Sequence, residues 1–149
     1  MAAMDIFIFG GFFKMKTKEI TVLKVEPKKK PCVCTLVNKL EDLQKAISIG
    51  ADYTGLIEII EIGDELGYEG KSVCLLCNEE GKLINLPPNR RLGHDIICGV
   101  FYITGQTRDG DLASLPEDAM KFYSKYFENI EHINPEDVGK CLGMSFEIL

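Results

Sequence analysis

Apolar residues occur along the chain in short runs that predict a β-sheet with a few helices. Runs rich in β-branched and apolar residues are typical of strands, and Gly or Pro clusters separate them. The predicted strands span residues 19–26, 32–37, 56–62, 72–77, 82–86 and 96–104. Residues 78–81 end in glycine between two of these runs, which predicts a hairpin turn at that point.

One internal segment changes from strand periodicity to helical spacing. Its apolar residues recur at intervals of three and four, which predicts an amphipathic helix over about 39–49. Asn38 precedes it and Glu41 follows three residues later, which is the pattern of a capping box. Gly50 is a plausible end for this helix.

The last third of the chain has the same helical spacing. We predict helices over about 115–129 and 135–141, the second with Pro135 at its first position. Ser114 and Glu117 form a second capping-box pattern before the first of them. The elements together predict an α+β fold, in which a mainly antiparallel sheet carries the 39–49 helix on one face and the C-terminal helices close the end.

The length of the chain, 149 residues, is that of one domain, and such a chain buries roughly two-thirds of its unfolded surface. We predict that residues 15–149 form a single globular domain. Residues 1–14 are interpreted as an extension upstream of a start at Met15 or as a flexible N-terminus, and the alternative is a short strand added to the sheet edge. Their apolar run is far shorter than the ~20 residues of a membrane span, so no membrane association is expected.

Charge and cysteine content narrow the class of partner and the compartment. The net charge of −6 argues against a protein held on DNA or RNA through phosphates, so no nucleic-acid binding is expected. An acidic surface either keeps the protein soluble or binds a basic surface of another protein. Most of the six cysteines lie in apolar runs and no secretory signal is evident, which favours free thiols and a cytoplasmic location.

The most distinctive polar run is Asn89-Arg90-Arg91, which follows two prolines and is expected in a turn or one helical turn. Two guanidinium groups beside an amide suit a carboxylate or phosphate, and His94 lies close enough in the sequence to join them. The alternative is structural: the asparagine caps a turn, and one arginine joins a loop to the core through backbone carbonyls.

This run carries a resemblance to a known family. Residues 79–91, Glu-Glu-Gly-Lys through Leu-Pro-Pro-Asn-Arg-Arg, resemble the hallmark of small bacterial and phage proteins catalogued only as a domain of unknown function. The strand at 22–27, the following helix, and the stretches 99–105 and 110–115 are similar to that family as well. The resemblance covers about residues 19–127. It implies no reaction, cofactor or catalytic residue, and it suggests an accessory role in mobile elements or phages.

The cysteines are weak candidates for a metal site. Cys74 and Cys77 have the CxxC spacing, and Cys32 and Cys34 would supply two further ligands. On a strand, however, residues three apart point to opposite faces, so the CxxC pair would converge only if the strand bends. We therefore expect neither a metal nor another cofactor.

The sequence leaves two classes of function open. The first is a non-catalytic accessory or interaction protein with a protein partner or self-association, for which partly exposed aromatics at Phe122 and Tyr126 would be suitable contacts. The alternative is a binder or enzyme of a small anionic, phosphate- or nucleotide-like compound that uses the run 89–91. Without a recognisable catalytic motif, the first reading is favoured over an enzyme.

Overall fold

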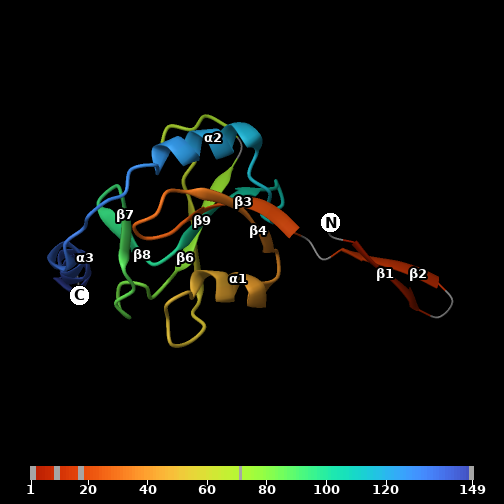
Figure 1. Ribbon diagram of the computed structural model, residues 1–149, viewed down its shortest axis with the longest axis horizontal. Helices are drawn as coiled ribbons and strands as arrows, with labels where there is room; N and C mark the ends of the chain where they lie inside the picture. Colours follow the sequence, from red (N-terminus) through yellow and green to blue (C-terminus); the bar gives the residue numbers. More distant parts are fainter. Residues whose placement is uncertain (1–2, 9–10, 17–18, 71, 148–149) are drawn as a thin grey trace.

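Figure 1 shows the computed structural model, which describes residues 3–8, 11–16, 19–70 and 72–147, with side chains from 19 to 70 and from 72 to 142. Six strands form one sheet in the order β4-β3-β9-β6-β5, with β10 paired to β9, and all its pairings are antiparallel. The strands are β3 (Glu19–Val25), β4 (Cys32–Val37), β5 (Ile57–Glu61), β6 (Val73–Asn78), β9 (Phe101–Gln106) and β10 (Leu112–Ala113). The predicted α+β fold with a mainly antiparallel sheet is confirmed.

A helix covers each face of this sheet, α1 (Leu40–Ile47) on one and α2 (Glu117–Tyr126) on the other (Figure 1). The helix residues buried against the sheet are Leu43 and Ile47 of α1 and Ala119 and Tyr123 of α2. Because both faces are covered, the central strands are apolar at successive positions, and all six residues of β6 are buried. The second helix thus lies on a sheet face and does not close the end.

Neither predicted side-chain cap is present. Helix α1 begins two residues after Asn38, whose Nδ2 donates to the carbonyl of Leu112 (3.1 Å). Helix α2 begins three residues after Ser114, whose Oγ accepts the backbone N–H of Thr21 (2.9 Å). The two capping predictions are wrong because each polar side chain joins the start of a helix to a neighbouring segment of the sheet.

A separate antiparallel hairpin joins β7 (Pro88–Leu92) to β8 (Asp95–Cys98). The run 89–91, which was expected in a turn or one helical turn, lies in β7. The single strand predicted over 96–104 is divided, because Gly99 takes a φ of +86° between β8 and β9. That left-handed conformation favours glycine and turns the chain away from an extended path.

The strand predicted over 82–86 is wrong, and so is the hairpin at 78–81. Residues 79–85 form consecutive turns, and β6 pairs with β5 and β9 instead. Asn85 takes a φ of +59°, and Leu86 is buried in a small core with Ile96 and Cys98. The apolar residues of this segment therefore follow from burial in that small core and not from strand pairing.

Helix α3 (Pro135–Glu147) begins at the predicted proline and extends beyond the predicted end at 141. It contacts β8 (Figure 1). Its Val138 packs against the small core that contains Leu86. Among the described helices, none combines the length and the apolar character needed to cross a lipid bilayer.

Near the N-terminus, β1 (Ala3–Ile8) and β2 (Gly11–Lys16) pair with each other in a two-stranded antiparallel sheet (Figure 1). In the part of the chain that the structure describes, these strands do not pair with the six-stranded sheet. The alternative of a strand added to its edge is therefore wrong. The division into residues 1–14 and 15–149 stays a prediction.

Candidate functional site

Asn89 and Arg90 lie together in the interior because β7 carries a bulge. The pairing register with β8 shifts between Pro88 and Arg90, so Asn89 is an extra residue in the strand. Successive strand residues normally point to opposite faces. Here both are buried, with Asn89 0% and Arg90 1% exposed, and Arg91 is the first residue of the run to face outward.

The amide of Asn89 is fully used inside the protein. Its Nδ2 donates to the carbonyls of Val25 (2.8 Å) and Gly99 (2.9 Å), at the end of β3 and just before β9. Its Oδ1 accepts Nη1 of Arg90 (2.8 Å). Both amide hydrogens therefore have protein partners.

The guanidinium of Arg90 connects three segments of backbone. Nε and Nη2 donate to the carbonyl of Phe127 (3.1 and 3.0 Å), and Nη2 donates to the carbonyl of Lys29 (2.8 Å). Phe127 is the C-cap of α2, so the positive charge lies at the negative end of the helix dipole. Burial lowers the pKa of Arg90, while nearby Glu131 raises it, and an arginine stays protonated in proteins.

The other two predicted ligand residues lie elsewhere. Arg91 is exposed, and its Nη2 donates to Asp137 of α3 (2.9 Å). His94 is exposed in the turn between β7 and β8. The structure therefore brings Asn89 and Arg90 together and leaves Arg91 and His94 apart from them. Two parallel guanidinium groups for one anion are not formed, and ligand binding at this run stays a prediction.

Residues in the earlier part of the same run hold the turns 79–85 against β8. A Cβ placed on Gly81 would lie 2.6 Å from the carbonyl oxygen of Cys98, so only glycine fits this close approach. The Nζ of Lys82 pairs with Asp95 and also donates to the carbonyl of Ile96 (3.4 Å). Gly81, Lys82 and the buried pair Asn89 and Arg90 thus hold this run against neighbouring segments of the fold.

The four candidate metal ligands do not converge. Cys74 lies in the core on the α1 side of the sheet, and Cys77 lies in the core on the α2 side. Cys32 and Cys34 are on β4, which β3 and β9 separate from β6. Burial and then the carboxylate of Glu58 raise the pKa of Cys77 to about 12. Among the residues described, no group of three or more His, Cys, Asp or Glu side chains is placed to hold a metal ion.

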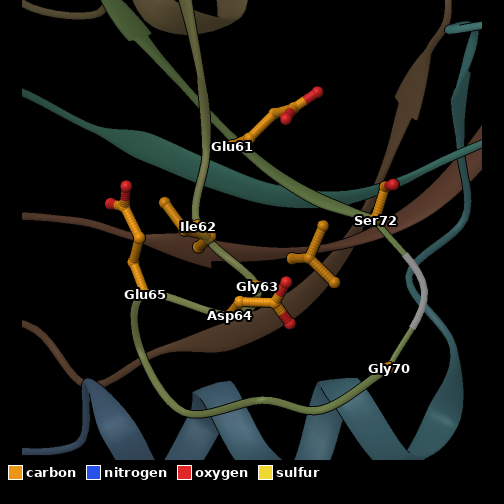
Figure 2. A pocket seen from close by; sticks show the side chains of 8 residues that line it. Glu61, Ile62, Gly63, Asp64, Glu65, Gly70 and Ser72 are labelled. Carbon is orange, nitrogen blue, oxygen red and sulfur yellow. The ribbon is translucent and has the colours of Figure 1, made fainter.

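A recess of about 250 Å³ lies between the end of β5 and the start of β6 (Figure 2). Its acidic side chains are Glu61, Asp64 and Glu65, and Ser72 lies across from them. Figure 2 shows these carboxylates pointing in different directions rather than toward one point. The recess is therefore an acidic surface without the geometry of a binding centre.

The aromatic residues of α2 divide between core and surface. Phe122 packs against the core, and its ring lies 5.5 Å from that of Tyr68. Tyr126 is 45% exposed. Of the two rings, only that of Tyr126 presents a large part of its surface to a partner.

The open side of β4 carries backbone groups that pair with no other strand among the described residues. Thr21 of β3 donates its N–H to Ser114 Oγ, and its carbonyl accepts the N–H of Leu115 (2.8 Å), so both groups point away from β4. Thr35 is the residue paired with Thr21, and this is therefore a non-hydrogen-bonded pair of the antiparallel ladder. The N–H and C=O of Thr35, and by alternation those of Val33, point outward.

Within β4 itself, this edge lacks the charged residues and prolines that commonly protect an edge strand. The strand reads Cys-Val-Cys-Thr-Leu-Val, without charge or proline, and no described strand pairs with its outer side. The side chain of Val33 is 58% exposed. An edge strand of this kind is a template for pairing with another chain.

The opposite edge is protected. β5 contains Glu58 and Glu61, both exposed, and charged residues on an edge discourage strand addition. Leu56 accepts the N–H of Glu79, so by alternation Ile59 points its N–H outward. The two edges therefore differ in charge and not in the availability of backbone groups.

Lysines lie before the start of the open edge and on the helix beside it, in a chain that is acidic as a whole. Residues 28–30, in the turn before β4, are three exposed lysines. A hollow of about 570 Å³ between β4 and α2 is lined by Val33, Met120, Lys121, Ser124, Lys125 and Glu128. Sequence reasoning found the strand at 32–37 but not the edge, because strand order depends on pairings between distant residues.

Comparison with known proteins gives a family and no further relative. Over residues 20–128, more than half of the chain, the sequence matches the family described as Domain of unknown function (DUF3846). No curated protein and no solved structure matches the chain. The matched segment runs from β3 to the end of α2, so it contains β4 and the buried pair Asn89 and Arg90.

Proposed function

Because the chain belongs to the DUF3846 family, whose description assigns no activity, we propose its function from geometry: a protein-binding module that pairs the open side of β4 with an extended segment of a partner protein. Strand addition of this kind takes affinity from main-chain hydrogen bonds and specificity from pockets for alternate side chains. An accessory role in mobile elements or phages is compatible with such a module.

The observation that carries the proposal is the uncharged open edge of β4. Val33 and Thr35 each present one donor and one acceptor outward, which gives a partner strand four main-chain positions to pair with. Each hydrogen bond contributes about 0.5–1.5 kcal/mol net, so the pairing alone supports weak and reversible binding. The side chain of Val33 and the hollow beside α2 offer additional apolar contact.

The alternative of an anion-binding enzyme has no comparable support. The donors of Asn89 and of Arg90 Nε and Nη2 already bond to protein carbonyls, and Arg91 pairs with Asp137. A site built from them would first have to break these bonds. The edge of β4 requires no such rearrangement.

The test is a selection of displayed random peptides on the wild-type protein and on a Thr35→Pro variant. Proline at position 35 removes an N–H that points outward and leaves the hydrogen bonds to β3 intact. A Val33→Lys variant places a charge on the same edge without altering the backbone. The matched control is Ile59→Pro, which removes an outward N–H from the protected edge β5.

We expect selected peptides to bind the wild type and Ile59→Pro equally and to lose roughly tenfold or more in affinity toward Thr35→Pro and Val33→Lys. Circular dichroism on all variants checks that each remains folded. Peptides whose affinity is the same for all four proteins, or a selection that enriches no peptide at all, would overturn the proposal.

A further inference from the structure

We infer that the segment that pairs with β4 carries acidic side chains at its C-terminal end, where five lysines of this protein bind them. The inference rests on the proposed function and adds the chemistry of the partner. It follows from where positive charge lies in a chain whose net charge is −6.

The first group of lysines lies in the turn that leads into β4. Lys28, Lys29 and Lys30 are all exposed. Lys29 is 3.4 Å from Glu26, which also contacts Lys24 (3.3 Å). Among the described residues, Lys28 and Lys30 have no ion pair, so their charges are available to a partner.

The second group lies on α2, across the hollow from Val33. Lys121 and Lys125 line this hollow together with Glu128. The bonds of Arg90 to the carbonyls of Lys29 and Phe127 hold the lysine turn beside the end of α2. The two groups, Lys28–Lys30 and Lys121 with Lys125, are therefore parts of one basic surface next to the open edge, and this surface also contains Glu26 and Glu128.

The direction of the partner follows from the sheet. Every pairing in the six-stranded sheet is antiparallel, and antiparallel pairing is slightly more stable per residue than parallel pairing. An antiparallel partner places its C-terminal end beside the start of β4 at Cys32, next to residues 28–30. Acidic side chains and a free terminal carboxylate at that end lie within reach of the lysines.

A second copy of the same chain fits this surface less well. β4 has no acidic residue to offer. A two-fold axis that joins two β4 strands in one continuous sheet is perpendicular to that sheet, so both α2 helices lie on the same face. The lysines at 121 and 125 of both copies would then lie on one side of the joint, where like charges repel.

The experiment uses two labelled peptides of alternating threonine and valine, one with glutamates and one with glutamines at the C-terminal end. Fluorescence anisotropy measures their binding to the full chain at low and at high salt. The test variant is the double substitution Lys30→Gln with Lys125→Gln. The matched control is Lys45→Gln with Lys140→Gln, which removes the same charge from α1 and α3.

We expect the glutamate peptide to bind roughly tenfold more tightly than the glutamine peptide, and this preference to disappear at high salt and in the Lys30/Lys125 variant only. Equal binding of both peptides would overturn the acidic-partner inference and leave the proposed function standing. Binding of neither peptide would overturn both. A dimer in sedimentation that Thr35→Pro abolishes would identify a second copy as the occupant and refute this inference alone.

Discussion

The buried guanidinium of Arg90 gives the sharpest prediction for stability. We consider Arg90→Met, which keeps the length and most of the volume of the side chain and removes all of its donors. The acceptors that lose a partner are the carbonyls of Phe127 and Lys29, Asn89 Oδ1 and, through a longer bond of 3.3 Å, the Asn89 carbonyl. Lys29 is exposed, so water can replace the arginine there, but Phe127 and Asn89 are buried.

The magnitude follows mainly from two buried acceptors with shorter bonds, the Phe127 carbonyl and Asn89 Oδ1. An unsatisfied buried acceptor costs about 1–3 kcal/mol, so two of them cost about 2–6 kcal/mol. Arg90→Met also removes a buried charge, and relief of the desolvation penalty of that charge offsets part of this loss of stability. We therefore expect the free energy of unfolding to fall by about 3 kcal/mol, a large part of the ~5–15 kcal/mol typical of a domain.

The assay is urea denaturation followed by circular dichroism. With a denaturant slope of about 1–3 kcal/mol per molar urea, the midpoint should fall by about 1–3 M. The control is Arg91→Met, which removes one exposed ion pair with Asp137 and should cost less than about 1 kcal/mol. Equal midpoints for the two variants would refute the structural role of Arg90, and a ligand-dependent effect without loss of stability would favour an anion site instead.

Three further predictions use the same denaturation and labelling methods. Gly81→Ala should lower the free energy of unfolding by about 1–3 kcal/mol, because its Cβ meets the Cys98 carbonyl; an unchanged midpoint would show that the turn can shift. Gly139→Ala, in an open position of α3, should raise stability by about 0.5–1 kcal/mol in thermal denaturation, and a decrease would contradict the helix there. Because its pKa is raised to about 12, the Cys77 thiol stays protonated at pH 8. A thiol reagent should therefore label exposed Cys32 first and Cys77 only after unfolding. Rapid labelling of Cys77 in the folded protein would contradict its burial.

The sequence predicted the sheet core and the helix faces well, because burial on two sides requires apolar residues at every position of a strand. The run 72–77 and the helical spacing around residue 43 are examples. It failed at 82–86, where apolar residues also recur but serve the small core around Leu86. A positive φ at Asn85 and another at Gly99 turn the chain there, and hydrophobic periodicity does not register such backbone changes.

For the candidate site, the sequence identified the polar residues but did not predict which of them face inward. Asn89, Arg90 and Arg91 were recognised as one polar run, but a bulge decides that the first two point inward and that Arg91 points outward. Bulges depend on the register with the partner strand, which one sequence does not specify. The open edge of β4 was missed for a related reason, since an edge exists only relative to the order of all the strands.

The bonds of Arg90 also set a limit on how far the chain can be shortened. They join residues separated by 61 and 37 positions, so they form only after the β3–β4 turn and the end of α2 have reached their places. A fragment that ends before Phe127 would retain an interior cation without its main acceptor. Such a fragment should fail to fold, whereas one that ends at residue 128, where the family match ends, keeps every acceptor of this arginine.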